Sequence, residues 1–165
     1  MVASAHFVAE LVARIEGLGC ALWLDGGWGV DALLGEQTRP HGDVDIVVEA
    51  CDLNRIRDAL SDRGFTLAQR EDTRPWNFVL ADAHDQQIDF HVITFDSDGN
   101  GIYGPPANGQ AYPAEAFAGR GRVAAQPVSC MSVTFQLANR SGYELRDKDH
   151  HDLARLRARF GGVES

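Results

Sequence analysis

The chain of 165 residues contains little cysteine and lysine and has no long apolar run. Its cysteines, Cys20, Cys51 and Cys130, lie far apart and form no C-x-x-C pair. This spacing argues against a disulfide framework or a zinc site and is typical of reduced cysteines in a cytoplasm. No segment approaches the roughly 20 apolar residues needed to span a membrane. We therefore expect a cytoplasmic protein without a membrane partner.

Basic residues are scarce and scattered. Lys148 is the only lysine, and the formal net charge is −9 at pH 7. A nucleic-acid-binding protein needs clustered Lys and Arg side chains to displace counterions from phosphates. The sequence therefore argues against a nucleic-acid partner, whereas its acidity is compatible with a small cationic substrate.

The remaining composition is that of an ordinary globular domain, with 44% hydrophobic and 24% charged residues. A chain of this length can bury a core without disulfides or a structural metal. The N-terminal stretch MVASAHFVAELVARIEGLG has no basic region and carries Glu10 and Glu16 within its apolar pattern. We expect it to form an amphipathic helix rather than a signal peptide.

Apolar periodicity and turn residues divide the chain into helices and strands. Helices are expected at 4–17, 28–35, 52–64, 132–140 and 147–160. Strands are expected at 20–27, 43–49, 65–70, 77–83 and 87–95, the last two as an antiparallel hairpin. The Gly- and Pro-rich stretch 96–127 predicts loops with at most one short helix or strand. This order predicts an α+β fold, a mixed β-sheet flanked by helices with a C-terminal helical segment.

The stretch HGDVDIVV, residues 41–48, carries two carboxylates on an apolar strand. Because side chains alternate between the faces of a strand, Asp43 and Asp45 point the same way. Like charges side by side repel unless a cation neutralises them, and paired carboxylates suit Mg²⁺. The alternative is a boundary between loop and strand, with Asp45 in solvent.

The stretch QIDFHVI repeats this pattern later in the chain, because Asp89 and His91 share one face of a strand. If that strand lies beside DVDIVV, Asp89 can join Asp43 and Asp45. Three carboxylates around one or two Mg²⁺ ions is an arrangement that clamps a nucleoside triphosphate. The alternatives are an edge-strand charge for Asp89 and a hydrogen-bonding role for His91.

The stretch LDGGWG follows a strand and precedes a helix. Gly26 and Gly27 would let the backbone approach an anion, with N–H groups of the helix N-terminus directed at it. The pattern is neither a Walker A sequence nor a Rossmann glycine motif. A plain strand-to-helix turn explains it equally well when it is taken alone.

Together, G-G-W-G, D-x-D and a later strand aspartate resemble the nucleotidyltransferases of the DNA polymerase β superfamily. The run WLDGGWGVDALLGEQTRPHGDVDIVV is similar to that of the lincosamide nucleotidyltransferases, and QIDFHVI resembles their third-carboxylate strand. VSCMS and SGYELRDKDHHDLARL resemble their C-terminal part. The resemblance implies a polymerase β-like nucleotidyltransferase fold in a single domain, 1–165. Its catalytic sheet would span about 20–95, and loops and C-terminal helices at about 96–165 would cover the substrate.

The resemblance also implies roles for individual residues. Asp43, Asp45 and Asp89 would be the catalytic carboxylates and Mg²⁺ ligands, with Asp89 as metal ligand, general base or both. The remaining site residues would be Gly26, Gly27, Trp28 and Arg39 for the nucleotide, and His91 and Tyr143 for the acceptor substrate.

The implied function is Mg²⁺-dependent transfer of AMP from ATP to a hydroxyl of a lincosamide such as lincomycin or clindamycin. Such transfer would inactivate the antibiotic and confer resistance. Alternatives are an aminoglycoside nucleotidyltransferase, a protein-modifying nucleotidyltransferase of a toxin–antitoxin pair, and a structural domain with accidental carboxylates. We also expect a loosely held homodimer, because a short chain leaves an open-sided pocket.

Overall fold

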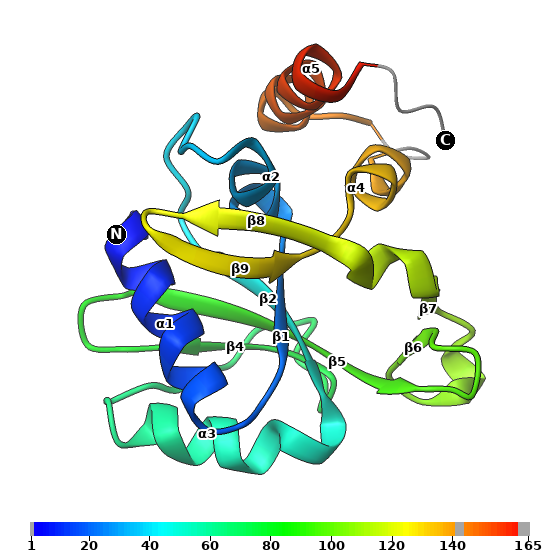
Figure 1. Cartoon of the computed structure of the whole chain (residues 1–165). Coiled ribbons are helices and arrows are strands. Elements are labelled where there is room, and N and C mark those ends of the chain that lie inside the picture. Colours follow the sequence, from blue (N-terminus) through cyan, green and yellow to red (C-terminus); the bar gives the residue numbers. More distant parts are fainter. Residues whose placement is uncertain (1, 141–143, 162–165) are drawn as a thin grey trace.

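The computed structural model describes residues 2–140 and 144–161 (Figure 1). A mixed sheet forms its centre, with the strand order β3-β4-β5-β2-β1-β9-β8 and with β6 and β7 attached beside β5. The α+β prediction is confirmed. The helices are α1 (Ala5–Gly17), α2 (Gly26–Leu34), α3 (Leu53–Ser61), α4 (Val133–Asn139) and α5 (Asp147–Phe160). The strands are β1 (Leu22–Asp25), β2 (Val44–Glu49), β3 (Thr66–Ala68), β4 (Asn77–Ala81), β5 (Gln87–Phe95), β6 (Gly101–Tyr103), β7 (Ala111–Tyr112), β8 (Gly119–Val123) and β9 (Gln126–Cys130).

The two faces of the sheet are packed differently. The alternate residues Val44, Ile46 and Val48 of β2 are fully buried in the main hydrophobic core. α1 and α3, which lie together in Figure 1, supply apolar side chains such as Ile15 and Ile56 to this core. The period-two pattern of the sequence therefore marks the covered face of the sheet.

The opposite face is covered only in part. Val47 and Ile93 lie in a smaller cluster with Phe117 and Met131, and Trp23 and Phe135 pack against it. This cluster seals one end of the face along β2 and β5. The other end, where Asp45 and Asp89 lie, is left open to a cleft.

The prediction of loops over 96–127 is wrong. This stretch contains β6, β7, β8 and short 3-10 helices at Pro106–Asn108 and Ala114–Ala118, and it reaches the first residues of β9. Glycine disfavours strands in sequence-based assignment, but β8 needs it here. A Cβ atom on Gly121 would lie 2.9 Å from the backbone nitrogen of Leu33, so α2 packs directly on the β8 backbone.

Two predicted helix starts also shift. α2 begins at Gly26 rather than at residue 28, because the Asp25 side chain accepts a hydrogen bond from the Gly26 N–H and caps the helix. α3 begins at Leu53 after a 3-10 turn, and the Asp52 side chain makes no capping bond. Among the described residues, no helix is both long and apolar enough to cross a membrane.

Candidate active site

Three aspartates lie in one row across the sheet. Asp25 of β1 is paired with Asp45 of β2, which are antiparallel neighbours, and Asp45 is paired with Asp89 of β5, which are parallel neighbours. Directly paired residues direct their side chains to the same face. The expected adjacency of the two carboxylate strands is therefore confirmed. Asp43, one residue before β2, lines the same cleft.

His91 lies beside this row. Its Nε2 is 3.3 Å from Asp45 Oδ1 and 3.9 Å from Asp89 Oδ1. Burial would lower the pKa of His91, but the hydrogen bond to Asp45 and the charges of Asp45 and Asp89 raise it to about 9. The two neighbouring carboxylates thus favour the charged form of the imidazole.

The carboxylates themselves titrate unusually. Burial, together with the charges of Asp45 and Asp43, raises the pKa of Asp89 to about 7, although the charge of His91 acts in the opposite direction. Burial and the charge of Asp45 also raise the pKa of Asp43. Concentrated negative charge in a partly dry cleft is costly in a protein, and such clusters mark functional sites more often than structural ones.

The chemistry of this donor set fits a divalent cation. Asp45, Asp89 and His91 can each bring one ligand atom within 4.8 Å of the other two. Asp43 falls outside this tight group, although it borders the cleft. Carboxylate oxygens are the ligands that hard cations such as Mg²⁺ prefer. The Asp45 and Asp89 side chains are therefore suitable candidates for holding such an ion, and Asp43 stays a predicted ligand at the border of the cleft.

The N-terminus of α2 forms the floor of the cleft, which has a volume of about 420 Å³. Gly26 and Gly27 line it, as predicted for the glycine turn. Gly26 has a φ of +56°, and a Cβ atom there would collide with the carboxylate of Asp45. The turn thus brings the helix N-terminus, with its partial positive charge, directly against the aspartate row.

Cationic side chains also line the cleft, and we call them its cationic wall. They are Arg39, Arg140, Arg146 and Lys148, and Asp149 and Asp152 lie among them. The first precedes β2, the second follows α4, and the other two lie at the start of α5. Carboxylates and cations that line one cleft suit a metal-bound polyphosphate, because the metal binds the former and the phosphates bind the latter.

Arg39 was predicted from sequence to meet a phosphate, and the structure gives it a protein partner. Its Nε and Nη2 donate to the two carboxylate oxygens of Asp152 in α5, at 2.9 and 3.0 Å. The guanidinium nevertheless borders the cleft.

The other predicted binding residues differ in position. The indole of Trp28 is buried, with its ring centroid 4.8 Å from that of His41, so only the backbone of this residue is available to a nucleotide. His91 lines the cleft, and its contact with the acceptor stays a prediction. Tyr143, predicted to contact the acceptor, lies outside the described residues.

Sequence reasoning missed Asp25, Gln136 and Arg140, which also line the cleft. Asp25 could have been found from the sequence. It lies two residues after Trp23 and is the last residue of that strand, directly before the glycines. Gln136 and Arg140 carry no local signal, since α4 reaches the cleft only through tertiary packing.

A second cavity of about 470 Å³ adjoins the cleft and shares His91, Tyr112 and Asn139 with it. Tyr103 and Phe135 complete its aromatic walls. The ring centroids of Tyr112 and Phe135 are 5.3 Å apart, and those of Tyr103 and Tyr112 are 5.9 Å apart. This volume is within the range of pockets for drug-sized molecules.

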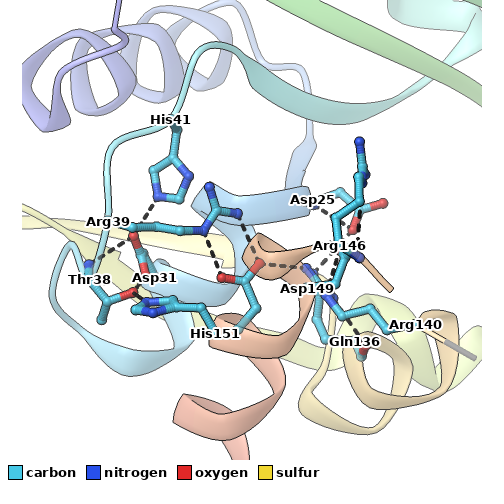
Figure 2. Close-up of polar contacts among 12 residues, drawn as sticks. Asp25, Asp31, Thr38, Arg39, His41, Gln136, Arg140, Arg146, Asp149 and His151 are labelled. Atoms are coloured by element: carbon cyan, nitrogen blue, oxygen red, sulfur yellow. Dashed lines mark hydrogen bonds and ion pairs between the residues drawn. The ribbon is translucent and has the colours of Figure 1, made fainter. Parts of the chain in front are cut away.

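The loop between α2 and β2 is fixed by a buried carboxylate (Figure 2). Asp31 of α2 accepts hydrogen bonds from the backbone N–H and hydroxyl of Thr38, at 3.0 and 2.6 Å, and contacts His41 Nε2. His151 of α5 in turn lies 3.0 Å from the Thr38 hydroxyl. Asp31 thus holds the loop that carries Arg39.

Replacing Asp31 with alanine is expected to lower the free energy of unfolding by about 3 kcal/mol, because it leaves a buried partner unpaired. The melting temperature should fall by about 6–12 °C in a chain of this size. Burial would raise the pKa of Asp31, but its bonds to His41 and Thr38 outweigh this and lower it. The stability difference from wild type should therefore be complete above about pH 4 and shrink as the pH falls through the lowered pKa. Thermal melts of both proteins across this pH range test the prediction, and a constant difference would contradict it.

Comparison with known proteins identifies the class to which this fold and site belong. The family model for aminoglycoside-2''-adenylyltransferases matches residues 7–156. The chain belongs to this family and is a nucleotidyltransferase, which confirms the resemblance seen in its motifs.

Particular relatives narrow the comparison. A lincosamide resistance protein from Staphylococcus haemolyticus is 30% identical over 143 residues, covering 87% of this chain and 88% of the relative. A crystal structure of the lincosamide antibiotic adenylyltransferase LnuA with lincomycin bound aligns with a TM-score of 0.79 and 29% identity, over 92% of this chain and 94% of that one. A structure of ANT(2'')-Ia with adenylyl-2''-tobramycin aligns with a TM-score of 0.70 at 19% identity, over 96% and 90% of the two chains, which supports the fold alone.

Proposed function

We propose that this protein transfers AMP from ATP to a hydroxyl of a lincosamide antibiotic and thereby confers resistance. The observation that carries the proposal is the pairing of Asp45 with Asp89 directly beside the glycine N-terminus of α2, in a cleft that cationic side chains also line. The similarity to the lincosamide resistance protein and to LnuA supports the substrate class. ATP in the cytoplasm would serve as the co-substrate, so the cytoplasm is the proposed location of the protein.

In this proposal Asp43, Asp45 and Asp89 hold one or two Mg²⁺ ions. The chemistry supplied by bound Mg²⁺ is neutralisation of phosphate charge and a lower pKa for the attacking hydroxyl. Asp89 ends the row on β5, the strand whose His91 lines both the cleft and the adjoining cavity, so Asp89 would also take the hydroxyl proton. As the acceptor's hydroxyl oxygen bonds to the α-phosphorus, the bond between this phosphorus and the oxygen that bridges to the β-phosphorus breaks, and pyrophosphate leaves.

The triphosphate would lie beside the α2 N-terminus and the cationic wall. The N–H groups at Gly27 and Trp28 would donate to its oxygens, whereas the Gly26 N–H already donates to Asp25, and Gly26 would only let the backbone approach. Arg39, whose guanidinium lies over Gly27, would neutralise phosphate charge together with Arg140. This division uses backbone donors for orientation and guanidinium groups for charge.

The acceptor would occupy the adjoining aromatic cavity, with His91 at the junction of the two spaces. Among the described residues that line this cavity, none carries a carboxylate. An aminoglycoside, which carries several ammonium groups, would need such partners. The lining therefore favours a lincosamide over the aminoglycoside alternative, although the family description and the overall acidity keep the latter as the second candidate.

Mass spectrometry tests both candidates. Lincomycin and kanamycin are each incubated with the protein, ATP and Mg²⁺, and with EDTA in place of Mg²⁺ as a control. We expect lincomycin to gain one adenylyl mass only when the metal is present. A gain on kanamycin alone would retain the chemistry and overturn the substrate, and no gain on either would overturn the proposal. The homodimer stays a prediction, which light scattering of the purified protein can test.

A further inference from the structure

A chain of polar contacts surrounds the glycine turn of the cleft (Figure 2). It begins at Asp25, whose Oδ1 accepts from the Gly26 N–H at 2.8 Å and from Gln136 Nε2 at 3.1 Å. Arg140 Nη1 then donates to Gln136 Oε1 at 2.6 Å. These contacts connect α4 to the start of α2.

Asp152 of α5 closes this chain on the other side. Its Oδ2 accepts from Arg140 Nη2 at 3.1 Å and from Arg39 Nη2 at 3.0 Å, and its Oδ1 accepts from Arg39 Nε at 2.9 Å. Arg39 Nη2 would lie only 2.6 Å from a Cβ atom on Gly27, so the guanidinium lies directly over the second glycine. One carboxylate thus holds the two arginines that flank the turn.

The burial of Asp152 makes this arrangement demanding. The residue is 1% exposed, and a carboxylate withdrawn from water is costly unless charged donors satisfy it. Three charge-assisted hydrogen bonds from two guanidinium groups meet that requirement and fix both groups in orientation. Arg39, whose side chain is 19% exposed, can then present its remaining donors to the cleft without reorganising when an anion enters, whereas Arg140 is nearly buried and holds Asp152 from the other side.

We propose that Asp152 is a positioning residue of the nucleotide site. It orients Arg39 beside the triphosphate, with Arg140 as its second cationic partner, and so makes α5 a functional part of that site. The inference rests on the proposed function only in taking the cleft as the triphosphate site.

Whether phosphate binding becomes tighter or weaker when the Asp152 charge is removed distinguishes a positioning role from a simple effect of net charge. Removing an anion near a phosphate site should tighten phosphate binding if only net charge matters. If Asp152 acts by orienting the arginines, its loss should weaken binding even though the site becomes more positive. Anchoring of α5 alone would change thermal stability and leave phosphate affinity unchanged.

The test measures binding of Mg²⁺-tripolyphosphate, and separately of Mg²⁺-ATP, by isothermal titration calorimetry. Asp152→Asn is expected to weaken both by roughly tenfold, because its amide would present N–H groups to a guanidinium that has only donors. Asp147→Asn is the matched control, since it removes the same charge from an exposed position on the same helix and should leave affinity unchanged. In the activity assay, KM for ATP should rise more than kcat falls.

A double-mutant cycle tests whether the effect of Asp152 on tripolyphosphate binding acts through Arg39. In an Arg39→Ala background, Asp152→Asn should weaken tripolyphosphate binding clearly less than in wild type. Arg39→Lys, which keeps the charge but loses the bidentate pairing, should also weaken binding and serves if Asp152→Asn does not fold. Unchanged or tighter binding in Asp152→Asn, or additive effects in the cycle, would overturn the inference alone. If Asp152→Asn does not fold, wild-type affinity in Arg39→Lys would overturn the inference instead. If the wild-type protein binds neither tripolyphosphate nor ATP, the inference and the proposed function are both overturned.

Discussion

Replacing Asp45 with asparagine is expected to reduce kcat for AMP transfer by roughly 10³-fold or more, the scale on which one preorganised charged group can act in a transition state. Asp45 occupies the centre of the carboxylate row, between Asp25 and Asp89, and contacts His91. Its amide analogue would retain the shape of the side chain but lose the charge required to hold a divalent cation. Asp43→Ala is expected to act in the same direction.

The same substitution should leave the fold intact. The Asp45 and Asp89 side chains are 24% and 26% exposed, and their mutual repulsion contributes to the raised pKa of Asp89. Neutralising one carboxylate relieves that repulsion, which offsets the weaker contact with His91. We therefore expect a melting curve close to that of the wild type.

Asp58→Asn, on the exposed side of α3, is the control for removal of one acidic charge. It should retain wild-type kcat. An Asp45→Asn protein that transfers AMP at the wild-type rate, or that does not fold, would contradict the assignment of Asp45 to the metal.

The parts of the site predicted from sequence are those encoded by local periodicity. Asp45 and Asp89 each interrupt an apolar strand at alternate positions, so a single strand pattern predicts both the face and the charge. The hairpin of β4 and β5 followed from its turn residues and is confirmed. The parallel pairing of β2 with β5 then brought the two aspartates together.

The parts that escaped prediction depend on contacts between distant segments. β8 is predicted poorly because Gly119 and Gly121 lower strand propensity, and only tertiary packing explains them. The backbone of Cys130 and Met131 lies against Gly119, and that of α2 lies against Gly121. Arg39 meets Asp152 across more than a hundred residues of sequence, and Arg140 joins them through its own bond to Asp152. No periodicity relates such positions, so the network around the glycine turn emerges only once the chain is folded.

The second large effect is expected at Gly26. Gly26→Ala should lower kcat/KM for ATP by roughly 10²-fold, the cost of displacing a reacting group by about 1 Å. A Cβ atom at this position would lie 2.9 Å from Asp45 Cγ and closer still to its carboxylate oxygen. The carboxylate must therefore move out of its row, which disturbs the metal ligands and the phosphate floor together.

Gly35→Ala separates this displacement from backbone strain, because Gly35 terminates the same helix with a φ of +77° and has open space around its Cβ position. Both substitutions force alanine into the left-handed region, at a cost of about 1–2 kcal/mol. Both proteins should therefore lose stability in thermal melts, Gly26→Ala at least as much as Gly35→Ala because its collision with Asp45 adds to the strain, but only Gly26→Ala should lose activity. Equal activity in the two variants would contradict the close approach of the α2 N-terminus to Asp45. Backbone strain alone would then explain the effects of Gly26→Ala.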